Sequence, residues 1–171
     1  MKTKFIFIAS LFILAISFSI IACKKSNKTV PIQLLLTDNP IDYDEVNIHI
    51  VGMQVKINND EAAWITIDAK DTTVNLLDLQ KGITEVIAQD DVPEGILKEV
   101  RFILASDNTI VIDNVSYDLQ TPSAEDSGLK IKIDKKLNET LNTFVLDFDV
   151  PLSIKEENGN YKLSPVIRLK P

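Results

Sequence analysis

The chain has 171 residues, of which 18 are lysine or arginine and 25 are aspartate or glutamate, so its net charge is −7. All 25 acidic residues follow position 30, together with only 13 of the basic ones, and this part of the chain therefore carries a charge of −12. A surface this acidic repels the phosphates of nucleic acids and of anionic lipids, which excludes both as partners of the folded region.

The first 22 residues have the order of a secretory leader. The opening MKTK carries two lysines, and the uncharged run FIFIASLFILAISFSIIA continues to Ala22. This run ends in Ile-Ile-Ala-Cys, which resembles the lipobox of bacterial lipoproteins, with Cys23 as the lipidated residue. We predict a lipoprotein signal peptide over residues 1–22, and a lipidated cysteine with a polar tether over residues 23–30. The alternative is an uncleaved membrane helix.

The residues around Cys23 also indicate a location. Several acyl chains would anchor the protein firmly, because each buried CH2 contributes about 0.8 kcal/mol. Lys24 stands where an aspartate retains enteric lipoproteins in the inner membrane, so we expect an outer-membrane protein of a Gram-negative cell envelope, on either leaflet face. Since Cys23 is the one cysteine of the chain, an intramolecular disulfide and a thiolate nucleophile are excluded.

From residue 31 onward, apolar and polar residues alternate with the period of two that is typical of β-strands. The inward positions that this alternation predicts are Ile32, Leu34 and Leu36; Val46, Ile48 and Ile50; Met53, Val55 and Ile57; Leu129, Ile131 and Ile133; Phe144, Leu146 and Phe148; and Tyr161, Leu163, Ile167 and Leu169. The parity changes between Ile50 and Met53, and a β-bulge at Gly52 would restore it.

Turn-forming residues separate these runs. Asp113-Asn114 lies between TIVI and VSYDL and predicts a two-residue hairpin turn. The segment 76–91 offers one short helix or another pair of strands. Many short strands with regular turns predict an all-β fold, and we expect one antiparallel Greek-key β-sandwich of the immunoglobulin or transthyretin type over residues 31–171, with at most one short helix.

Six segments carry a resemblance to a known family. They are LLLTDNPIDYDEVNIHIVGMQV, LLDLQKG, VPEGILKEVRFIL, TPSAEDSGLKI, LDFDVPLSI and YKLSPVIRL. Together and in this order they resemble a bacterial lipoprotein domain family, domain of unknown function 4382, over nearly all of residues 31–171. The resemblance implies an all-β sandwich on a secreted, lipid-anchored protein with no established activity.

The segment TDNPIDYDE places acidic residues at the corner after the first strand. The Asp-Asn-Pro sequence that begins at Asp38 favours a turn. Asp42 and Asp44 share the parity of the inward-facing Val46, where a buried charge is unfavourable. Two interpretations stay open: a corner that turns these carboxylates to solvent, or a calcium site built from Asp38, Asp42 and Asp44, because calcium prefers oxygen ligands.

A second acidic pair, Asp147 and Asp149, shares one face of the strand FVLDFDV. If this strand forms a hairpin with LKIKID, Lys130 and Lys132 lie opposite the two aspartates, and each ion pair contributes roughly 0.2–1 kcal/mol. The alternative is a pair of calcium ligands. We favour the hairpin, because it requires no further ligand.

The loop TPSAEDSGLKI precedes a strand at one end of the predicted sandwich. It carries hydroxyl and carboxylate groups suited to a sugar or a peptide, and end loops often hold the binding residues of sandwiches. The candidate ligand residues are Thr121, Ser123, Glu125, Asp126 and Ser127. The alternative is an ordinary connecting loop.

Besides Cys23, two residue types occur once in the chain, histidine and tryptophan. We expect His49 on the solvent side of its strand and Trp64 in the core. The sequence contains no Ser-x-x-Lys, Gly-x-Ser-x-Gly or His-Glu-x-x-His motif and no glycine-rich phosphate loop. We therefore predict that the protein is not an enzyme and needs no cofactor, calcium being the one candidate.

Three function classes follow from these observations. The first is a lipid-anchored, non-enzymatic binding or accessory module of the cell envelope, with a glycan or an envelope protein as its ligand. The second is a calcium-stabilised structural or adhesion domain. The third is a hydrolase that uses two carboxylates. We expect the first.

Overall fold

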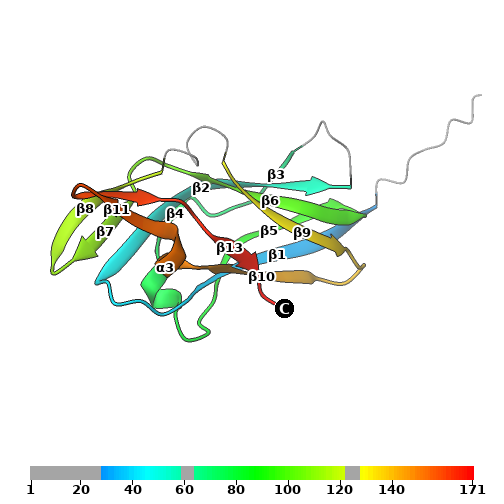
Figure 1. Cartoon of the computed structure of the whole chain (residues 1–171). Coiled ribbons are helices and arrows are strands. Elements are labelled where there is room, and N and C mark those ends of the chain that lie inside the picture. The colour runs from blue at the N-terminus through cyan, green and yellow to red at the C-terminus, as the bar shows by residue number, and fades with distance from the viewer. Residues whose placement is uncertain (1–27, 59–63, 122–127) are drawn as a thin grey trace, which may run out of the picture.

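The structure is a computed structural model, and it describes residues 28–58, 64–121 and 128–171. The described residues form thirteen strands: β1 (Thr29–Asp38), β2 (Glu45–Ile57), β3 (Ile65–Ile67), β4 (Thr72–Asn75), β5 (Glu85–Pro93), β6 (Ile96–Leu104), β7 (Thr109–Ile112), β8 (Val115–Gln120), β9 (Leu129–Lys136), β10 (Asn142–Phe148), β11 (Ile154–Glu157), β12 (Asn160–Leu163) and β13 (Ile167–Leu169). Two helical turns, η1 (Leu76–Leu79) and α3 (Val150–Ser153), complete the fold (Figure 1). The predicted signal peptide and Cys23 lie outside the described residues.

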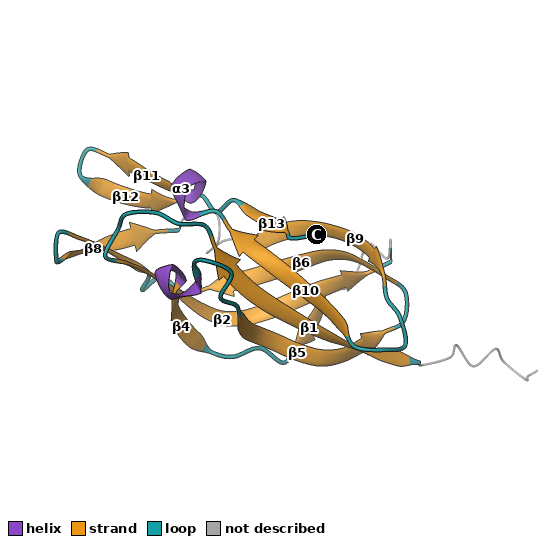
Figure 2. Cartoon of the chain, turned by 90° about the horizontal axis from the view of Figure 1, so that it is seen from below, coloured by secondary structure: helices purple, strands orange, loops and turns teal. Residues whose placement is uncertain are grey.

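The strands form two sheets that pack face to face, which confirms the all-β sandwich. The smaller sheet has the order β13-β10-β1-β5, and it lies over the larger sheet, whose order is β11-β12-β8-β7-β2-β6-β9 with β3 and β4 beside β2 (Figure 2). Both sheets are mixed, because β1 pairs with β10 and β8 with β12 in parallel. The sequence predicted antiparallel pairing, since its period-two pattern is the same for both directions of pairing.

The core lies between the two sheets and contains most of the residues that the alternation placed inward. Four others are only partly buried at its edge: Leu129, Tyr161, Ile167 and Leu169. Ile32, Leu34 and Leu36 of β1 are fully buried against Phe148 of β10 and the apolar face of β2. The predicted bulge at Gly52 is present, because the register between β2 and β6 shifts there. Burying such side chains contributes about 1.5–3 kcal/mol each, so this apolar face is the main source of stability.

The predicted hairpin between the strands at 129 and 144 is wrong. β9 pairs with β6 at the edge of the larger sheet, whereas β10 lies between β1 and β13 in the smaller one. The apolar faces of β9 and β10 therefore meet across the core instead of side by side. Alternation alone does not separate these two arrangements, because it specifies which side chains face inward and not which strand is the neighbour.

The structure confirms the hairpin turn that the sequence predicted at Asp113-Asn114. Asp113 and Asn114 have φ values of 51° and 63°, as a type I′ hairpin turn requires, and they join β7 to β8. The segment 76–91 contains both the short helix η1 and the beginning of β5.

β1 begins at Thr29, so two residues that we assigned to the tether belong to the first strand. None of the helices in the described part of the chain has the length and apolarity needed to cross a membrane.

Candidate functional site

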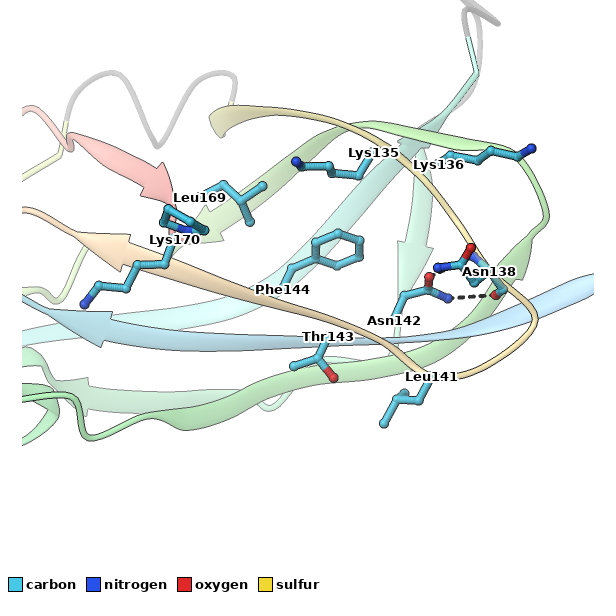
Figure 3. Close-up of a pocket in the computed structure, with 10 residues that line it drawn as sticks. Lys135, Lys136, Asn138, Leu141, Asn142, Thr143, Phe144, Leu169 and Lys170 are labelled. Carbon is cyan, nitrogen blue, oxygen red and sulfur yellow. Dashed lines mark hydrogen bonds between the residues drawn. The ribbon is translucent and has the colours of Figure 1, made fainter.

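A hollow lies at the end of the sandwich where β1 begins. It has a volume of about 530 Å³ and opens to solvent between the last residues of β9, the first residues of β10 and the end of β13 (Figure 3). Its lining residues are Lys135, Lys136, Asn138, Leu141, Asn142, Thr143, Phe144, Leu169, Lys170 and Pro171. The lining thus combines ammonium groups and amides with an apolar floor.

The hollow exists because β13 is shorter than β10. β13 pairs with β10 from Leu146 to Phe148, and the N–H of Lys170 donates to the carbonyl of Val145, so only residues 142–144 of β10 have no paired strand on that side. Phe144 therefore lies at the bottom of an opening rather than under a neighbouring strand, and it is 9% exposed. A free strand edge also presents backbone donors and acceptors to any molecule that enters.

Lys135 is the charged residue that reaches over this hollow. It follows Ile131 and Ile133 in the inward alternation of β9, and its partner across the strand pair is the fully buried Leu97. Figure 3 shows its side chain extending from β9 above Phe144 toward Leu169, while Lys136 points away. Lys135 remains exposed, because the smaller sheet does not cover this end of β9.

A buried amide holds the rim of the hollow. Asn142 is 8% exposed, and its Nδ2 lies 3.0, 2.9 and 2.8 Å from the carbonyl oxygens of Pro31, Asn138 and Thr140. Its Oδ1 accepts the backbone N–H of Asn138 at 2.8 Å. The loop between β9 and β10 is therefore tied both to itself and to β1.

The hollow lies close to the point where the expected tether enters the fold. Lys28 forms ion pairs with Glu139 of the β9–β10 loop and with Glu94. The hydrogen bond from Lys28 lowers the pKa of the Glu139 carboxyl. The opposite end of the molecule is formed by β7, β8, β11 and β12 (Figure 1).

The three residues of the predicted calcium site are not brought together. Asp42 and Asp44 are exposed, as a solvated corner predicts, and Asp44 accepts the backbone N–H of Asn114 at 2.8 Å. Asp38 is buried, at 2% exposure, and accepts the N–H of Val150 at 3.2 Å. No group of three potential ligand side chains among the described residues is arranged to hold a metal ion.

Asp38 is instead a buried carboxylate at the end of β1. Its Oδ2 has no hydrogen-bond partner. Burial raises the pKa of this carboxyl to about 6, and the nearby charges of Asp147 and Asp149 act in the same direction, whereas the N–H groups of Val150 and Asn39 lower it. A carboxyl with this pKa is half protonated near pH 6 and mostly ionised at pH 7, so its burial is unfavourable at neutral pH.

Asp147 and Asp149 have other partners than Lys130 and Lys132, as the strand order requires. Lys170 Nζ lies 3.8 Å from Asp147 Oδ1, and Arg168 lies 3.9 Å from Asp149. Asp149 also caps α3 by accepting the N–H of Leu152. Both aspartates therefore form ion pairs, as predicted, but their cationic partners are Arg168 of β13 and Lys170, the residue after it.

Of the five candidate ligand residues, the structure describes only Thr121. Ser123, Glu125, Asp126 and Ser127 lie outside the described residues. Thr121 is fully buried, and Asn108 Nδ2 lies 3.4 Å from its hydroxyl. Asn108 also accepts the N–H of His49 at 2.8 Å. The Thr121 hydroxyl is thus held within the fold, and the loop stays a prediction.

His49 and Trp64 both lie on the outer face of the larger sheet. His49 is held between Asp107 Oδ1, 2.7 Å from Nδ1, and Asp71 Oδ1, 2.8 Å from Nε2, and these hydrogen bonds raise its pKa. Trp64 is half-buried under the Arg101 guanidinium, 3.9 Å from the ring centre, and not in the core as predicted. Its position follows from its parity with the exposed Thr66.

Sequence reasoning missed the hollow, although one signal for it is present. In LKIKIDKK the inward positions read Leu, Ile, Ile and then Lys135, so a lysine occupies the place of a core residue.

Comparison with curated proteins and with solved structures found no match. The sequence does match the family described as Domain of unknown function (DUF4382) over residues 29–165. This match covers most of the chain, and the chain therefore belongs to that family.

Proposed function

We propose that the protein is a lipid-anchored lipoprotein of a Gram-negative cell envelope and acts there as a non-enzymatic binding module. Its ligand, a glycan or a segment of an envelope protein, would occupy the hollow between β9, β10 and β13. The observation that carries this proposal is the exposed Lys135 ammonium above the apolar floor of Phe144 and Leu169.

The lining of the hollow supports binding rather than catalysis. It consists of lysines, amides, one threonine and apolar side chains. A carboxylate pair of the kind that hydrolyses glycosidic bonds is not among these described lining residues. The exposed carboxylates Asp42 and Asp44 lie at the other end of β1, away from this lining.

A glycan suits this lining better than a purely apolar ligand. A sugar ring has an apolar face and a rim of hydroxyl groups, so it needs both an apolar floor and hydrogen-bonding groups around it. The free edge of β10 and the exposed Asn138 provide such groups beside Phe144. The volume of about 530 Å³ lies within the range of small-molecule sites.

The leader and the lipobox-like sequence support the anchor. Residues 24–27 separate Cys23 from Lys28, and a link of this length spans at most about 18 Å. A lipidated Cys23 would thus keep the β9–β10 end of the domain near the membrane, within reach of glycans that lie on it.

The anchor is tested first. The full chain is expressed in a Gram-negative host, and the mass of its mature N-terminus is measured. We expect a processed chain that begins at Cys23 and carries acyl groups. The Cys23→Ala variant should be neither processed at this position nor acylated. An unprocessed wild-type chain would show that the apolar segment is a membrane helix.

Binding is tested with the full chain in detergent micelles on an array of envelope and extracellular glycans. Leu141→Glu places a charge in the rim of the hollow at a residue that is 48% exposed, and Ile83→Glu is the matched control, because Ile83 is 57% exposed and lies outside the lining. We expect Leu141→Glu to abolish binding and Ile83→Glu to leave it unchanged. Glycan binding that survives both changes would place the site elsewhere.

A further inference from the structure

We infer that the hollow between β9, β10 and β13 selects an acidic saccharide, whose carboxylate binds the Lys135 ammonium while its ring lies on Phe144 and Leu169. This inference rests on the proposed function and adds the chemical class of the ligand. It concerns a sugar that carries a carboxylate, such as a hexuronate.

The first step is the position of the charge. Lys135 stands at an inward-facing place of β9, opposite Leu97, where the preceding inward residues Ile131 and Ile133 belong to the core. An apolar residue would be the ordinary choice at such a place. The lysine therefore places an ammonium group at the mouth of the sandwich, beside an apolar floor.

The second step is that this charge has no protein partner. Within the part of the chain that the structure describes, the Lys135 ammonium makes no ion pair and no hydrogen bond, and only the backbone of this residue is paired, with β6. Lys132 and Lys98 share Asp134, and Lys170 faces Asp147. Lys136 also makes no ion pair among the described residues, but its side chain points away from the hollow (Figure 3). Lys135 thus keeps its charge available at the hollow, on a domain that is otherwise strongly acidic.

The third step is the combination of groups. A carboxylate on an ammonium group forms a charge-assisted hydrogen bond, which is roughly twice as strong as a neutral one. Phe144 and Leu169 offer the apolar contact that a ring face needs, and the edge of β10 offers backbone groups to hydroxyls. An apolar acid without hydroxyls would leave those polar groups without partners, and a neutral sugar would leave Lys135 without one.

The surrounding charge determines how the expected selectivity depends on salt. The net charge of the region after residue 30 repels anions at long range, so an acidic sugar gains affinity from short-range contacts with the lysines of the lining, chiefly Lys135. At salt concentrations of about 0.1–0.15 M, interactions between exposed charges more than about 8–10 Å apart are largely screened. We expect binding to weaken with salt much less than it would on a broadly basic surface.

The test uses the full chain in detergent micelles and isothermal titration calorimetry with trigalacturonate, with galactotriose as the neutral counterpart and with inorganic phosphate. We expect trigalacturonate to bind, and Lys135→Ala to weaken it by about tenfold, the loss of one charge-assisted contact. Lys135→Arg should retain most of the affinity. Lys130→Ala is the matched control, because Lys130 is an exposed lysine on the outer face of the same strand.

The outcomes separate this inference from the proposed function. Equal binding of galactotriose and trigalacturonate, with no effect of Lys135→Ala, would overturn the acidic-saccharide assignment and leave glycan binding intact. Phosphate binding as tight as that of trigalacturonate would also overturn it, because a bare anion would then suffice. If neither sugar binds and the glycan array is silent, the glycan part of the proposed function fails as well.

Discussion

A charged side chain faces inward at each end of the β1–β10 pair, but one of them is exposed to solvent and the other is buried. At the beginning of the pair, Lys135 faces inward from β9 and is exposed. At the end of the pair, Asp38 faces inward from β1 and is 2% exposed, with one oxygen unpartnered. A charged residue at a core-facing position is thus solvated in one case and desolvated in the other.

The difference comes from the elements that cover each end. β13 pairs with β10 only near Phe148 and leaves the Phe144 end open. At the other end α3 follows β10 directly, and its first N–H, from Val150, binds Asp38. The inward parity of a residue therefore does not decide its environment; the length of a neighbouring strand and the placement of one helical turn do.

The largest effect is expected from the open end, where Asn142 holds the β9–β10 loop. Asn142→Ala removes a buried amide and leaves the carbonyls of Pro31, Asn138 and Thr140 without this donor. We expect a loss of about 3 kcal/mol in the free energy of unfolding, measured by urea denaturation. Thr143→Ala, at the exposed neighbouring position, is the control. A loss as small as that of the control would show that the rim does not depend on Asn142.

The buried end is probed by Asp38→Asn. The folded pKa of Asp38 is about 6 and its ordinary value is 3.8, so the folded state binds the proton more tightly. Its contribution to stability is therefore greatest below pH 4 and declines as pH rises through about 6. We expect Asp38→Asn to be more stable than the wild type by about 2 kcal/mol at pH 8, and to remove this decline.

Urea denaturation at several pH values between 4 and 8 measures this effect. Asp42→Asn, in the exposed corner, is the matched control and should follow the wild type. Parallel pH profiles for the wild type and Asp38→Asn would mean that Asp38 is solvated like Lys135, and the contrast between the two ends would disappear.

A smaller effect is expected from His49, which lies on the outer face and belongs to neither end. Hydrogen bonds to Asp71 and Asp107 raise its pKa above 6.5. The stabilisation of the folded state by these hydrogen bonds is complete below pH 6.5, and it is lost as the pH rises through the raised pKa of His49. An NMR titration of the imidazole should show this shift, and Asp71→Asn and Asp107→Asn should each reduce it. An unshifted imidazole would remove the two aspartates as its partners.

The smallest effect is expected from calcium. If the N–H of Val150 and no cation satisfies Asp38 at the buried end, thermal unfolding with added calcium and with a chelator should give the same midpoint. A bound cation at 100 times its Kd would add about 2.7 kcal/mol to the stability and raise the midpoint clearly. A calcium-dependent midpoint would restore the calcium-stabilised alternative and give the unpartnered oxygen of Asp38 a ligand.

The predictable part of the fold is the part that local chemistry dictates. Alternation identified the buried faces of β1, β2 and β10, and the parity change at Gly52 located the bulge. Asp113-Asn114 specified its own turn, because such residues tolerate positive φ. The partners of Asp147 and Asp149 were mispredicted, because a carboxylate pairs with whichever cation the strand order brings near it.

The candidate site shows the same division. The lysine at position 135 of LKIKIDKK is visible in the sequence as a break in an apolar pattern. That this break lies beside Phe144 and Leu169 is a property of strands separated in the chain and joined only by packing. The candidate calcium residues, by contrast, are close in sequence, but Asp38 is buried at the end of β1 whereas Asp42 and Asp44 are exposed in the corner.

Residue order alone specifies the leader-like segment with its lipobox-like end at Cys23, the inward faces of the strands and the family, because these depend on local composition and on a period of two. Three features arise only when the chain packs: the parallel pairing of β1 with β10, the opening left by the short β13 and the burial of Asp38. These features depend on contacts between segments that are distant in the sequence. Local alternation is compatible with several such arrangements, and only the packing of the whole chain selects one of them.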